Sequence, residues 1–397
     1  MNVLIVSEPG VDGVFRYVER LVDHLLGRDV RVHLAYSDSR AGEALARFVD
    51  RVEDAGGRTL NLRVGNRPCL DDLRALLALR TFVRDLRPDL IHCHSAKAGA
   101  LARLLPVLGI LDVPLLYQPH AYIGMRPARG RLDFAYDAVE RVLGRWSTTL
   151  TCSYDEQNYA LHRLRIPPAR ARIVLNGVDT LRFFPAAAGR RRELRAAFGI
   201  PDDAVVLGSI CRSSAQKDPI TLYHAFARVA ARDPRLVLFH VGRGEFDPEL
   251  ERIVRENGLG NRVLRRPYLS DPVEFYQAVD GFALASRYEG FSLALLEALA
   301  ADLPLIVSEA PGNGDILGRP LSHLWHAPVG DVAAFSSAIG EWAAECASAV
   351  PTRRNHREIA RTYYDQRRSL ARVVSLYGKL RPSPAPSPGD TPAYARA

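Results

Sequence analysis

The sequence has few of the residues from which disulfide frameworks and structural metal sites are built. It contains five cysteines, an odd number, and no two of them are spaced as C-x-x-C. This pattern argues against a disulfide-built domain and against a zinc knuckle. We expect the cysteines to behave as small hydrophobic residues of a protein in a reducing compartment.

Long uninterrupted hydrophobic runs are also missing. The longest apolar stretch, Ala98–Tyr117, contains Arg103, Pro106, Asp112 and Pro114, which makes it a poor membrane span. The first apolar run meets an acidic residue almost at once, and no basic segment precedes it, so we expect no signal peptide. The sequence predicts a cytoplasmic protein, either free or peripheral on the inner membrane face.

Lysine is scarce, because only three of the 53 basic residues are lysines: Lys97, Lys217 and Lys379. The formal charge of +8 is spread evenly over the two halves of the chain, so no nucleic-acid-binding arm is predicted. An excess of arginine lies at residues 353–372. We expect it to be solvated, to pair across a domain junction or to contact a membrane surface.

Short β-branched runs alternate with helix-period segments along the whole chain. In the first half, the strand patterns lie at residues 3–6, 30–34, 90–92, 114–117 and 148–151, and the helical patterns at 14–26, 41–55, 70–86, 97–108 and 132–143. The strand patterns resume at 205–210, 236–240, 262–264, 281–285 and 305–307. Repeated strand and helix predict an α/β protein with two doubly wound, Rossmann-like domains.

A polar, proline-containing stretch at residues 176–188 separates the two halves. We therefore predict an N-terminal domain at 1–178 and a second domain at 179–351. A single helix is expected over 352–380, followed by a disordered proline-rich tail at 381–397.

Ligands of doubly wound sheets bind at the carboxyl ends of the strands, so the loops there are the places to search. The loop after the first strand of the second domain carries Arg212 and Lys217, two cations that can grip a diphosphate. The alternative is a solvated surface loop.

The segment Ser286–Ala300 is the most informative. It follows a strand and opens a helix, so the amides of Phe291, Ser292 and Leu293 can bind an anion at the positive end of the helix. Glu289 precedes the helix and Glu297 lies within it, eight residues on, among apolar neighbours. The alternative is a buried glutamate whose hydrogen bonds are satisfied by backbone.

Two weaker signals lie in the first domain. The loop at residues 7–14 contains Gly13 and opens a helix, but it lacks the G-x-G-x-x-G spacing of dinucleotide-binding loops, so a structural turn is as good a reading. The pair His92-x-His94 has no third ligand nearby, which disfavours a metal site. His94 is expected to line a cleft with Ser95 and Lys97.

Taken together, four motifs resemble one known family. They are R-Y-E-G-F-S-L-A-L-L-E from Arg287, R-S-S-A-Q-K-D-P from Arg212, V-L-N-G-V-D from Val174 and H-S-A-K-A-G from His94. In this order they are similar to the retaining glycosyltransferases of family 4. The resemblance extends to about Leu380 and implies the GT-B fold, in which two Rossmann-like domains face a central cleft.

The resemblance implies a donor site in the second domain. Arg212 and Lys217 would neutralise the donor diphosphate together with the three helix amides. Glu297 would accept hydrogen bonds from the ribose, and Glu289 would hold hydroxyls of the transferred sugar. Gly242, in the segment 241–244, would lie beside the base.

Three roles are implied for the N-terminal domain. Gly13 would let its loop close over the donor, and His120 would contact the donor sugar or the acceptor. The cleft residues His94, Ser95 and Lys97 would lie on the acceptor side. The sequence departs from the family pattern at three places: Asp12 precedes Gly13 where a second glycine is usual, Asp302 replaces a glycine, and Arg266-Pro267 replaces a small base-side turn.

As a mechanism, we expect sugar transfer from a nucleoside diphosphate with retention of configuration. His120, Glu289, Arg212 and Lys217 are the residues expected to act in it. The leaving phosphate is expected to deprotonate the acceptor. The chain has no D-x-D triplet, so no metal and no cofactor are expected, and cations stabilise the leaving group instead.

The sequence leaves the substrates open. UDP-sugars and GDP-mannose are both candidate donors, and the acceptor is a hydroxyl, which can belong to a lipid-linked glycan in polysaccharide or glycolipid biosynthesis. Two other functions are kept: a nucleotide-sugar epimerase of the same shape, and a non-catalytic nucleotide-sugar-binding protein.

Overall fold

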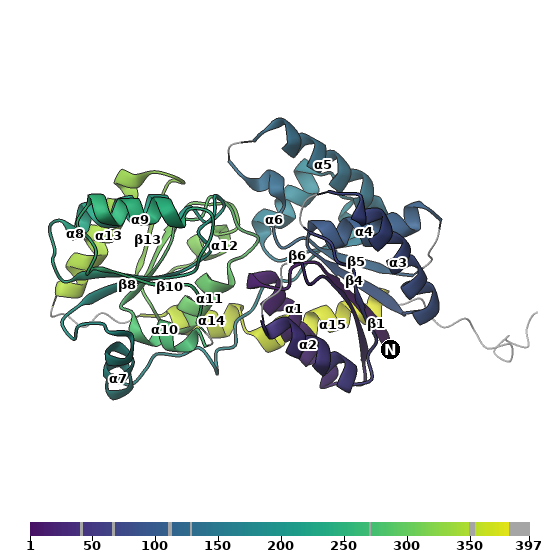
Figure 1. Cartoon of the computed structure of the whole chain (residues 1–397), viewed down its shortest axis with the longest axis horizontal. Helices are drawn as coiled ribbons and strands as arrows, with labels where there is room; N and C mark the ends of the chain where they lie inside the picture. Colours follow the sequence, from purple (N-terminus) through teal and green to yellow (C-terminus); the bar gives the residue numbers. More distant parts are fainter. Residues whose placement is uncertain are drawn as a thin grey trace, which may run out of the picture.

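The computed structural model describes residues 1–39, 43–65, 68–109, 113–127, 129–269, 271–348 and 354–380. The predicted proline-rich tail at 381–397 lies outside these residues. The chain forms two α/β domains side by side, each a parallel sheet with helices on both faces (Figure 1). The predicted fold class is therefore confirmed.

The N-terminal domain contains a seven-stranded parallel sheet of order β3-β2-β1-β4-β5-β6-β7 within the described residues. Its strands are β1 (Asn2–Ser7), β2 (Arg31–Tyr36), β3 (Thr59–Asn61), β4 (Leu90–His94), β5 (Leu115–Gln118), β6 (Thr148–Thr151) and β7 (Ala171–Ile173). Its helices are α1 (Asp12–Leu26), α2 (Glu43–Asp54), α3 (Asp71–Leu86), α4 (Ala96–Val107), α5 (Arg131–Leu143) and α6 (Tyr154–Asn158).

The second domain contains a six-stranded parallel sheet of order β10-β9-β8-β11-β12-β13. Its strands are β8 (Val205–Ile210), β9 (Leu236–Val241), β10 (Val263–Arg266), β11 (Gly281–Leu284), β12 (Leu305–Ser308) and β13 (Leu324–Ala327). Its helices are α7 (Ala188–Phe198), α8 (Pro219–Ala230), α9 (Asp247–Glu256), α10 (Val273–Ala278), α11 (Leu293–Ala300), α12 (Gly314–Leu317) and α13 (Val332–Ala347).

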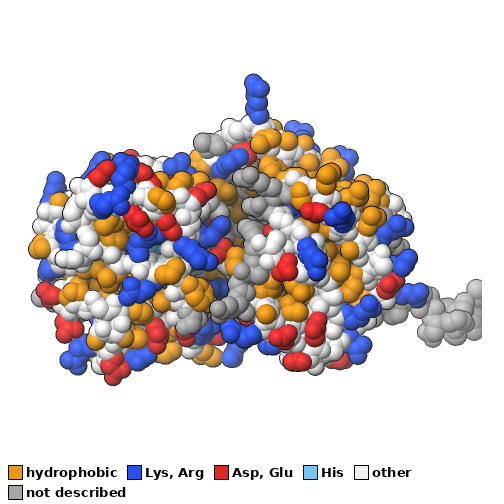
Figure 2. Space-filling model, viewed as in Figure 1, with side chains coloured by type: hydrophobic (Ala, Val, Ile, Leu, Met, Phe, Trp, Pro, Cys, Tyr) orange, Lys and Arg blue, Asp and Glu red, His pale blue; other side chains and the backbone are white. Residues whose placement is uncertain are grey.

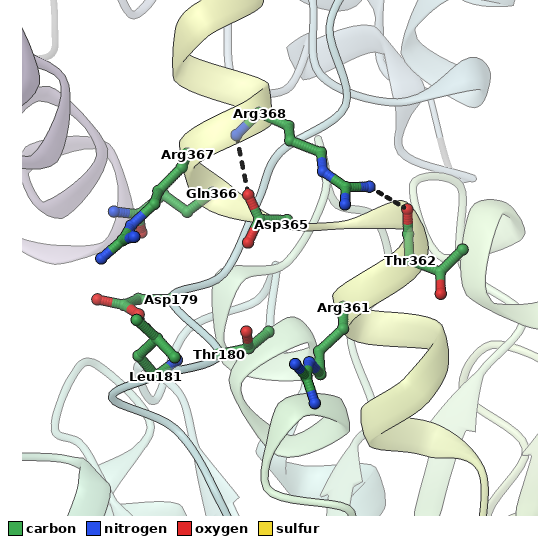
Figure 3. Close-up of a pocket in the computed structure, with 9 residues that line it drawn as sticks. All are labelled: Asp179, Thr180, Leu181, Arg361, Thr362, Asp365, Gln366, Arg367 and Arg368. Atoms are coloured by element: carbon green, nitrogen blue, oxygen red, sulfur yellow. Dashed lines mark hydrogen bonds between the residues drawn. The ribbon is translucent and has the colours of Figure 1, made fainter.

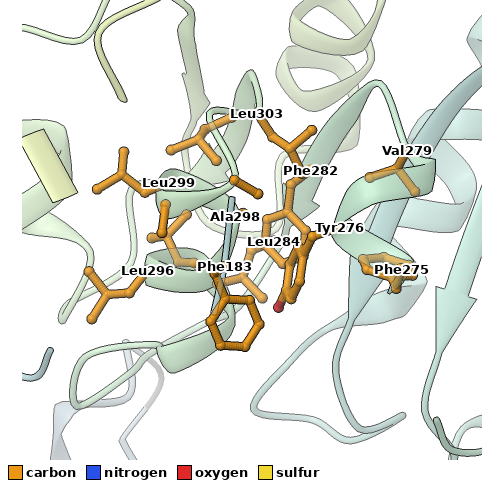
Figure 4. Close-up of a cluster of buried hydrophobic side chains, with 14 of the residues drawn as sticks. Phe183, Phe275, Tyr276, Val279, Phe282, Leu284, Leu296, Ala298, Leu299 and Leu303 are labelled. Atoms are coloured by element: carbon orange, nitrogen blue, oxygen red, sulfur yellow. The ribbon is translucent and has the colours of Figure 1, made fainter. Parts of the chain in front are cut away.

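Burial on both faces explains why the central strands are continuous apolar runs. In β1, Leu4 and Val6 pack into one hydrophobic cluster, whereas Val3 and Ile5 pack into another on the opposite face of the sheet. The second domain is built in the same way, and Figure 4 shows the aromatic and aliphatic side chains of its larger cluster around α11. Each sheet is thereby held between two apolar layers.

Three short strands were not predicted from the sequence: β3, β7 and β13. All three lie at an edge of their sheet. Their residues are only partly apolar, and most of them are not fully buried. An edge strand packs against fewer neighbours, so it lacks the continuous apolar run that marks a central strand.

The C-terminal segment differs from the single helix that we predicted. It forms two helices, α14 (His356–Tyr363) and α15 (Gln366–Leu380), with a break at Tyr364 and Asp365. Tyr364 packs in the core of the second domain, and Asp365 pairs with Val178 of the interdomain linker in an isolated β-bridge. The chain therefore returns to the N-terminal domain at this break, and α15 packs there through Leu370, Val373 and Tyr377.

A hollow of about 400 Å³ lies where the linker and this crossover run together. Its lining residues are Asp179, Thr180, Leu181, Arg361, Thr362, Asp365, Gln366, Arg367 and Arg368 (Figure 3). None of the predicted site residues is among them. Among the described residues, no helix combines the length and the apolar character that a membrane span requires.

Candidate active site at the domain junction

The loops at the carboxyl ends of the two sheets meet at the junction of the domains. Gly290, in the loop after β11, packs on the backbone of His120, in the loop after β5. A Cβ atom at Gly290 would lie 2.2 Å from the His120 carbonyl oxygen, so only glycine allows this approach. The junction therefore brings the predicted donor loops against the N-terminal domain.

Glu289 and Lys217 form the centre of the site. The Lys217 Nζ atom lies 2.6 Å from Glu289 Oε1, and the Ser286 hydroxyl donates to the same oxygen at 2.6 Å. Glu289 is 4% exposed, so its charge is balanced by the lysine and not by water. Ser286 lies two residues after the end of β11. The sequence did not identify it as a site residue, because a serine in a strand-to-helix loop is an ordinary feature.

Arg212 is positioned by the close packing of two loops. Gly242, with φ +144°, follows β9, and a Cβ atom there would lie 1.9 Å from the Cys211 carbonyl oxygen. Gly242 therefore lets the loop after β9 support the residue before Arg212. The structure gives Gly242 a packing role beside the donor set.

The Arg212 guanidinium reaches across the junction to the N-terminal domain. Its Nε atom lies 3.1 Å from Asp12 Oδ2, and both side chains are nearly half exposed. Asp12 has φ +66°, a conformation that glycine adopts freely and aspartate tolerates. The substitution that departs from the family pattern thus provides a partner for Arg212, while the space around Gly13 is open.

The amino end of α11 points into the same region. Ser292 is the N-cap residue, and its hydroxyl accepts a hydrogen bond from the amide of Leu295. The amides of Leu293 and Ala294 have no acceptor among the described residues. Phe291 is buried with its ring against Tyr364, so its backbone and not its side chain is available to a ligand.

Glu297 is held by the protein itself. It is 1% exposed, and Arg20 of α1 donates to its Oε1 atom at 2.7 Å, while the Tyr276 hydroxyl donates to Oε2 at 3.1 Å. Arg16 lies one helical turn before Arg20, 3.9 Å from Glu297. The predicted ribose contact is thus an ion pair between the domains in this structure. The spacing of Arg16 and Arg20 on one helical face was the signal available in the sequence.

A cluster of three histidines, His92, His94 and His120, lies on the side of the site that the N-terminal domain forms. We call it the histidine cluster. His94 Nδ1 lies 3.0 Å from His120 Nε2, and His92 Nδ1 lies 2.7 Å from the hydroxyl of Tyr377 on α15. Tyr17 of α1 packs on the ring of His120 at 4.8 Å between centroids. His94 is fully buried, so it supports His120 from below and does not itself line the surface.

Burial keeps the histidine cluster uncharged. It lowers the pKa of His120 to about 3 and holds the pKa of both His92 and His94 well below the usual value. His120 has φ +62°, a strained conformation that places its ring between His94 and Tyr17. A neutral imidazole at this position can donate or accept a hydrogen bond but carries no charge to the site.

The other predicted acceptor-side residues lie differently. Lys97 Nζ is 2.5 Å from Asp72 Oδ2, so the lysine is paired with α3. Ser95, with φ +75°, precedes α4, and its backbone N–H donates to the carbonyl oxygen of Gln118. Within the described parts of the chain, no group of three or more His, Cys, Asp or Glu residues is arranged to hold a metal ion.

Two doubly wound sheets opposed at their carboxyl ends, with cations, carboxylates and a helix amino end between them, define the GT-B fold. The model of Glycosyltransferase Family 4 matches residues 11–182, and that of Glycosyl transferases group 1 matches residues 190–362. Together they span most of the chain, which belongs to family 4. The family prediction from the sequence is confirmed.

Two curated relatives illustrate the similarity. The chain is 28% identical over 250 residues to the UDP-Gal:alpha-D-GlcNAc-diphosphoundecaprenol alpha-1,3-galactosyltransferase of Escherichia coli, covering 62% of this chain and 64% of that protein. It is 33% identical over 245 residues to a D-inositol 3-phosphate glycosyltransferase of Saccharomonospora viridis, covering 56% and 55%. The match thus spans less than two thirds of each relative.

Solved structures share the fold over nearly the whole chain. Sucrose-phosphate synthase of Thermosynechococcus elongatus has a TM-score of 0.77 at 20% identity and covers 96% of this chain and 98% of its own. Alr3699/HepE of Anabaena, in complex with UDP, has a TM-score of 0.76 at 18% identity, covering 96% and 100%. The two-domain fold of this chain is therefore shared with these solved structures.

Proposed function

We propose that this protein transfers a sugar from a UDP-sugar to a hydroxyl of a lipid-linked glycan, with retention of anomeric configuration. The observation that carries the proposal is the cluster of Lys217, Glu289 and Ser286 at the domain junction, beside the open amino end of α11 and Arg212. This set combines cations for a diphosphate with a carboxylate for sugar hydroxyls.

The reaction we infer uses positive charge at the leaving group. Arg212 releases Asp12 and binds the donor diphosphate instead. Lys217 and the Leu293 amide stabilise the charge that develops on the diphosphate as its bond to the anomeric carbon breaks and the acceptor oxygen bonds to that carbon. Glu289 keeps hydroxyls of the sugar in place. The leaving phosphate takes the proton of the acceptor hydroxyl on the same face, which retains the configuration. These groups supply the stabilisation without a divalent metal or another cofactor.

The donor is proposed from the relatives. The name of the Escherichia coli relative specifies UDP-galactose, and Alr3699/HepE has been solved with UDP and with UDP-glucose. GDP-mannose is the competing donor from the sequence. We expect UDP to raise the melting temperature of the protein more than GDP does, because a ligand that binds the folded state stabilises it by mass action.

The acceptor is proposed on the same grounds. The Escherichia coli relative acts, by its name, on a sugar linked to diphosphoundecaprenol, and another relative is an O-antigen biosynthesis glycosyltransferase, also of Escherichia coli. We therefore propose a glycan hydroxyl on a polyprenyl diphosphate as the acceptor and polysaccharide biosynthesis as the context of the reaction.

The test is release of nucleoside diphosphate from a panel of UDP-sugars and GDP-mannose, with and without polyprenyl-diphosphate glycan. We expect release of UDP that depends on the acceptor, and a product whose anomeric configuration, read by NMR, is that of the donor. Glu289→Gln should abolish transfer, whereas Glu309→Gln, at an exposed glutamate paired with His326, should not. Conversion of the donor without acceptor would identify an epimerase, and loss of activity in EDTA that Mg²⁺ restores would contradict metal independence.

A further inference from the structure

Helix α5 turns an apolar face to solvent. The large hydrophobic side chains on it and on the short turn that follows, Gly144–Trp146, are exposed: Leu132 71%, Phe134 55%, Tyr136 38%, Val139 49%, Val142 55% and Trp146 47%. Leu132, Tyr136, Val139, Val142 and Trp146 recur at helical spacing, so they form one stripe, which we call the α5 face. Surface helices of globular proteins usually bury such a stripe.

The acidic residues of α5 point the opposite way. Asp133 accepts from Arg126 Nε at 2.7 Å, Asp137 accepts from the Tyr159 hydroxyl at 2.6 Å, and Glu140 accepts from Arg103 Nη1 at 2.9 Å. Asp133 and Asp137 are buried, and Glu140 is half-buried. The helix therefore turns its carboxylates toward the protein, where they are paired, and its apolar stripe toward solvent.

The charges that α5 and its flanking turn do expose are all basic. Arg131 and Arg145 are exposed at the two ends of the α5 face, and no exposed Asp or Glu occurs between residues 131 and 146. Arg141 is exposed as well, but helical spacing places it away from the stripe, where it donates to the Arg163 carbonyl. Figure 2 shows hydrophobic and basic side chains gathered along the upper edge of the N-terminal domain, where Figure 1 places α5. An apolar stripe bordered by arginines alone complements an anionic lipid surface.

The α5 face lies close to the proposed acceptor side. The chain runs from His120 through the short turn Ile123–Met125, which contacts α5, to Arg126, the partner of Asp133 in the first turn of the helix. A bilayer on the α5 face would thus lie next to the side of the site that the N-terminal domain forms with His120.

The basic segment near the C-terminus, which the sequence suggested for membrane contact, serves the fold in part. Arg357 donates to the carbonyls of Phe183, Ala300 and Thr180, and Arg354 donates to that of Asp302. Its helices also lack an exposed apolar stripe of this kind. The α5 face is the better candidate.

We propose that the α5 face docks on an anionic bilayer. Docking would keep the candidate site at the domain junction close to acceptors in the membrane, and this consequence rests on the proposed function. The apolar stripe enters the interface between headgroups and acyl chains, and the flanking arginines contact the lipid phosphates. The attraction falls with salt because each arginine near the surface acts through a screened potential.

The experiment is cosedimentation of the full chain with sucrose-loaded vesicles. We compare phosphatidylcholine vesicles with vesicles rich in phosphatidylglycerol. The test variant is Leu132→Asp/Val139→Asp. The matched control is Leu73→Asp, at an exposed leucine of α3, whose solvent face also carries Asp71. Circular dichroism checks that each variant is folded, and Arg131→Gln/Arg145→Gln tests the charge without touching the stripe.

We expect binding to phosphatidylglycerol vesicles that the double aspartate variant lowers by at least about tenfold and that Leu73→Asp leaves unchanged. The arginine variant should lower it by about fivefold for each charge removed. Equal binding by the double aspartate variant and the wild type would overturn the proposal, as would loss of binding in the Leu73→Asp control. A wild type that binds no vesicles and dimerises through α5 would also overturn it.

Transfer to a detergent-dispersed acceptor separates this proposal from the proposed function. The double aspartate variant should retain that activity, because none of its changes lies in the site. Normal transfer without vesicle binding would refute only the docking. Vesicle binding without transfer to any acceptor would refute only the proposed function.

Discussion

The ion pair of Lys217 and Glu289 allows the sharpest test of the site. Lys217→Met removes the cation but keeps much of the apolar stem of the side chain. It leaves Glu289, 4% exposed, with the Ser286 hydroxyl as its remaining close side-chain partner among the described residues. A second change, Glu289→Gln, then removes the stranded charge while its amide oxygen can still accept from Ser286.

The size of the effect follows from burial. Breaking a buried ion pair by removing one partner costs about 3–5 kcal/mol, and the Lys217 side chain is 19% exposed, so we expect about 3 kcal/mol. For a domain of this size that lowers the melting temperature by roughly 6–12 °C. The double variant should regain most of this loss. UDP affinity behaves differently, because a charged hydrogen bond of about 1.5–3 kcal/mol is lost in both variants. This corresponds to a Kd raised about 10- to 150-fold.

The assay is thermal unfolding with and without UDP, supported by calorimetric titration. Lys379→Met, at an exposed lysine near the end of α15, is the matched control and should change neither quantity. If the double variant binds UDP with nearly normal affinity, Lys217 serves only to neutralise Glu289, and the assignment of the lysine to the diphosphate is wrong. If the single variant keeps its melting temperature, the buried pair does not form.

Three further results are expected. Asp12→Asn frees Arg212 from an exposed ion pair worth less than about 1 kcal/mol, so the stability of the protein should stay the same. Calorimetry should show UDP bound up to about fivefold more tightly, and weaker binding would contradict this expectation. Arg20→Ala leaves the buried Glu297 without its closest cation and should lower the free energy of unfolding in urea by about 3 kcal/mol, with no change refuting the interdomain pair. The histidine cluster is neutral when folded, so its contribution to stability is complete above the unfolded pKa near 6.5 and is lost as the pH falls toward the lowered folded values, by about 1.4 kcal/mol per pH unit for each histidine. His94→Gln should flatten the acid side of the stability profile, and an unchanged slope would count against a buried neutral ring.

Much of the fold could be read from the sequence because its central strands are buried on both faces. The strands β1, β8 and β9 contain the continuous apolar runs Val3–Val6, Val205–Leu207 and Leu236–Phe239, and such runs are local signals. The edge strands β3 and β13 lack that signal, since their side chains are only partly covered by neighbours. The break between α14 and α15 was missed for a related reason: it depends on the bridge from Asp365 to the distant Val178.

The candidate site, like the fold, could be predicted from the sequence only in part. Loops that follow strands could be located from the sequence, so Arg212, Lys217 and Glu289 were predicted as candidates, and they lie at the junction. The partner of Arg212 could not be predicted, because Asp12 meets Arg212 only when two separate domains come together. The burial of His94 was not predicted for the same reason, since it depends on packing against Tyr17 of α1 and His120 of the loop after β5.

The sequence alone therefore determined the fold class, the family and the chemical types of the site residues, because strand runs and loop motifs are encoded locally. Only the tertiary structure decided which charges are paired, that Glu297 binds arginine across the junction, and that α5 exposes its apolar stripe. These properties arise from contacts between residues hundreds of positions apart, or from the absence of a covering neighbour, and neither is written in any local pattern.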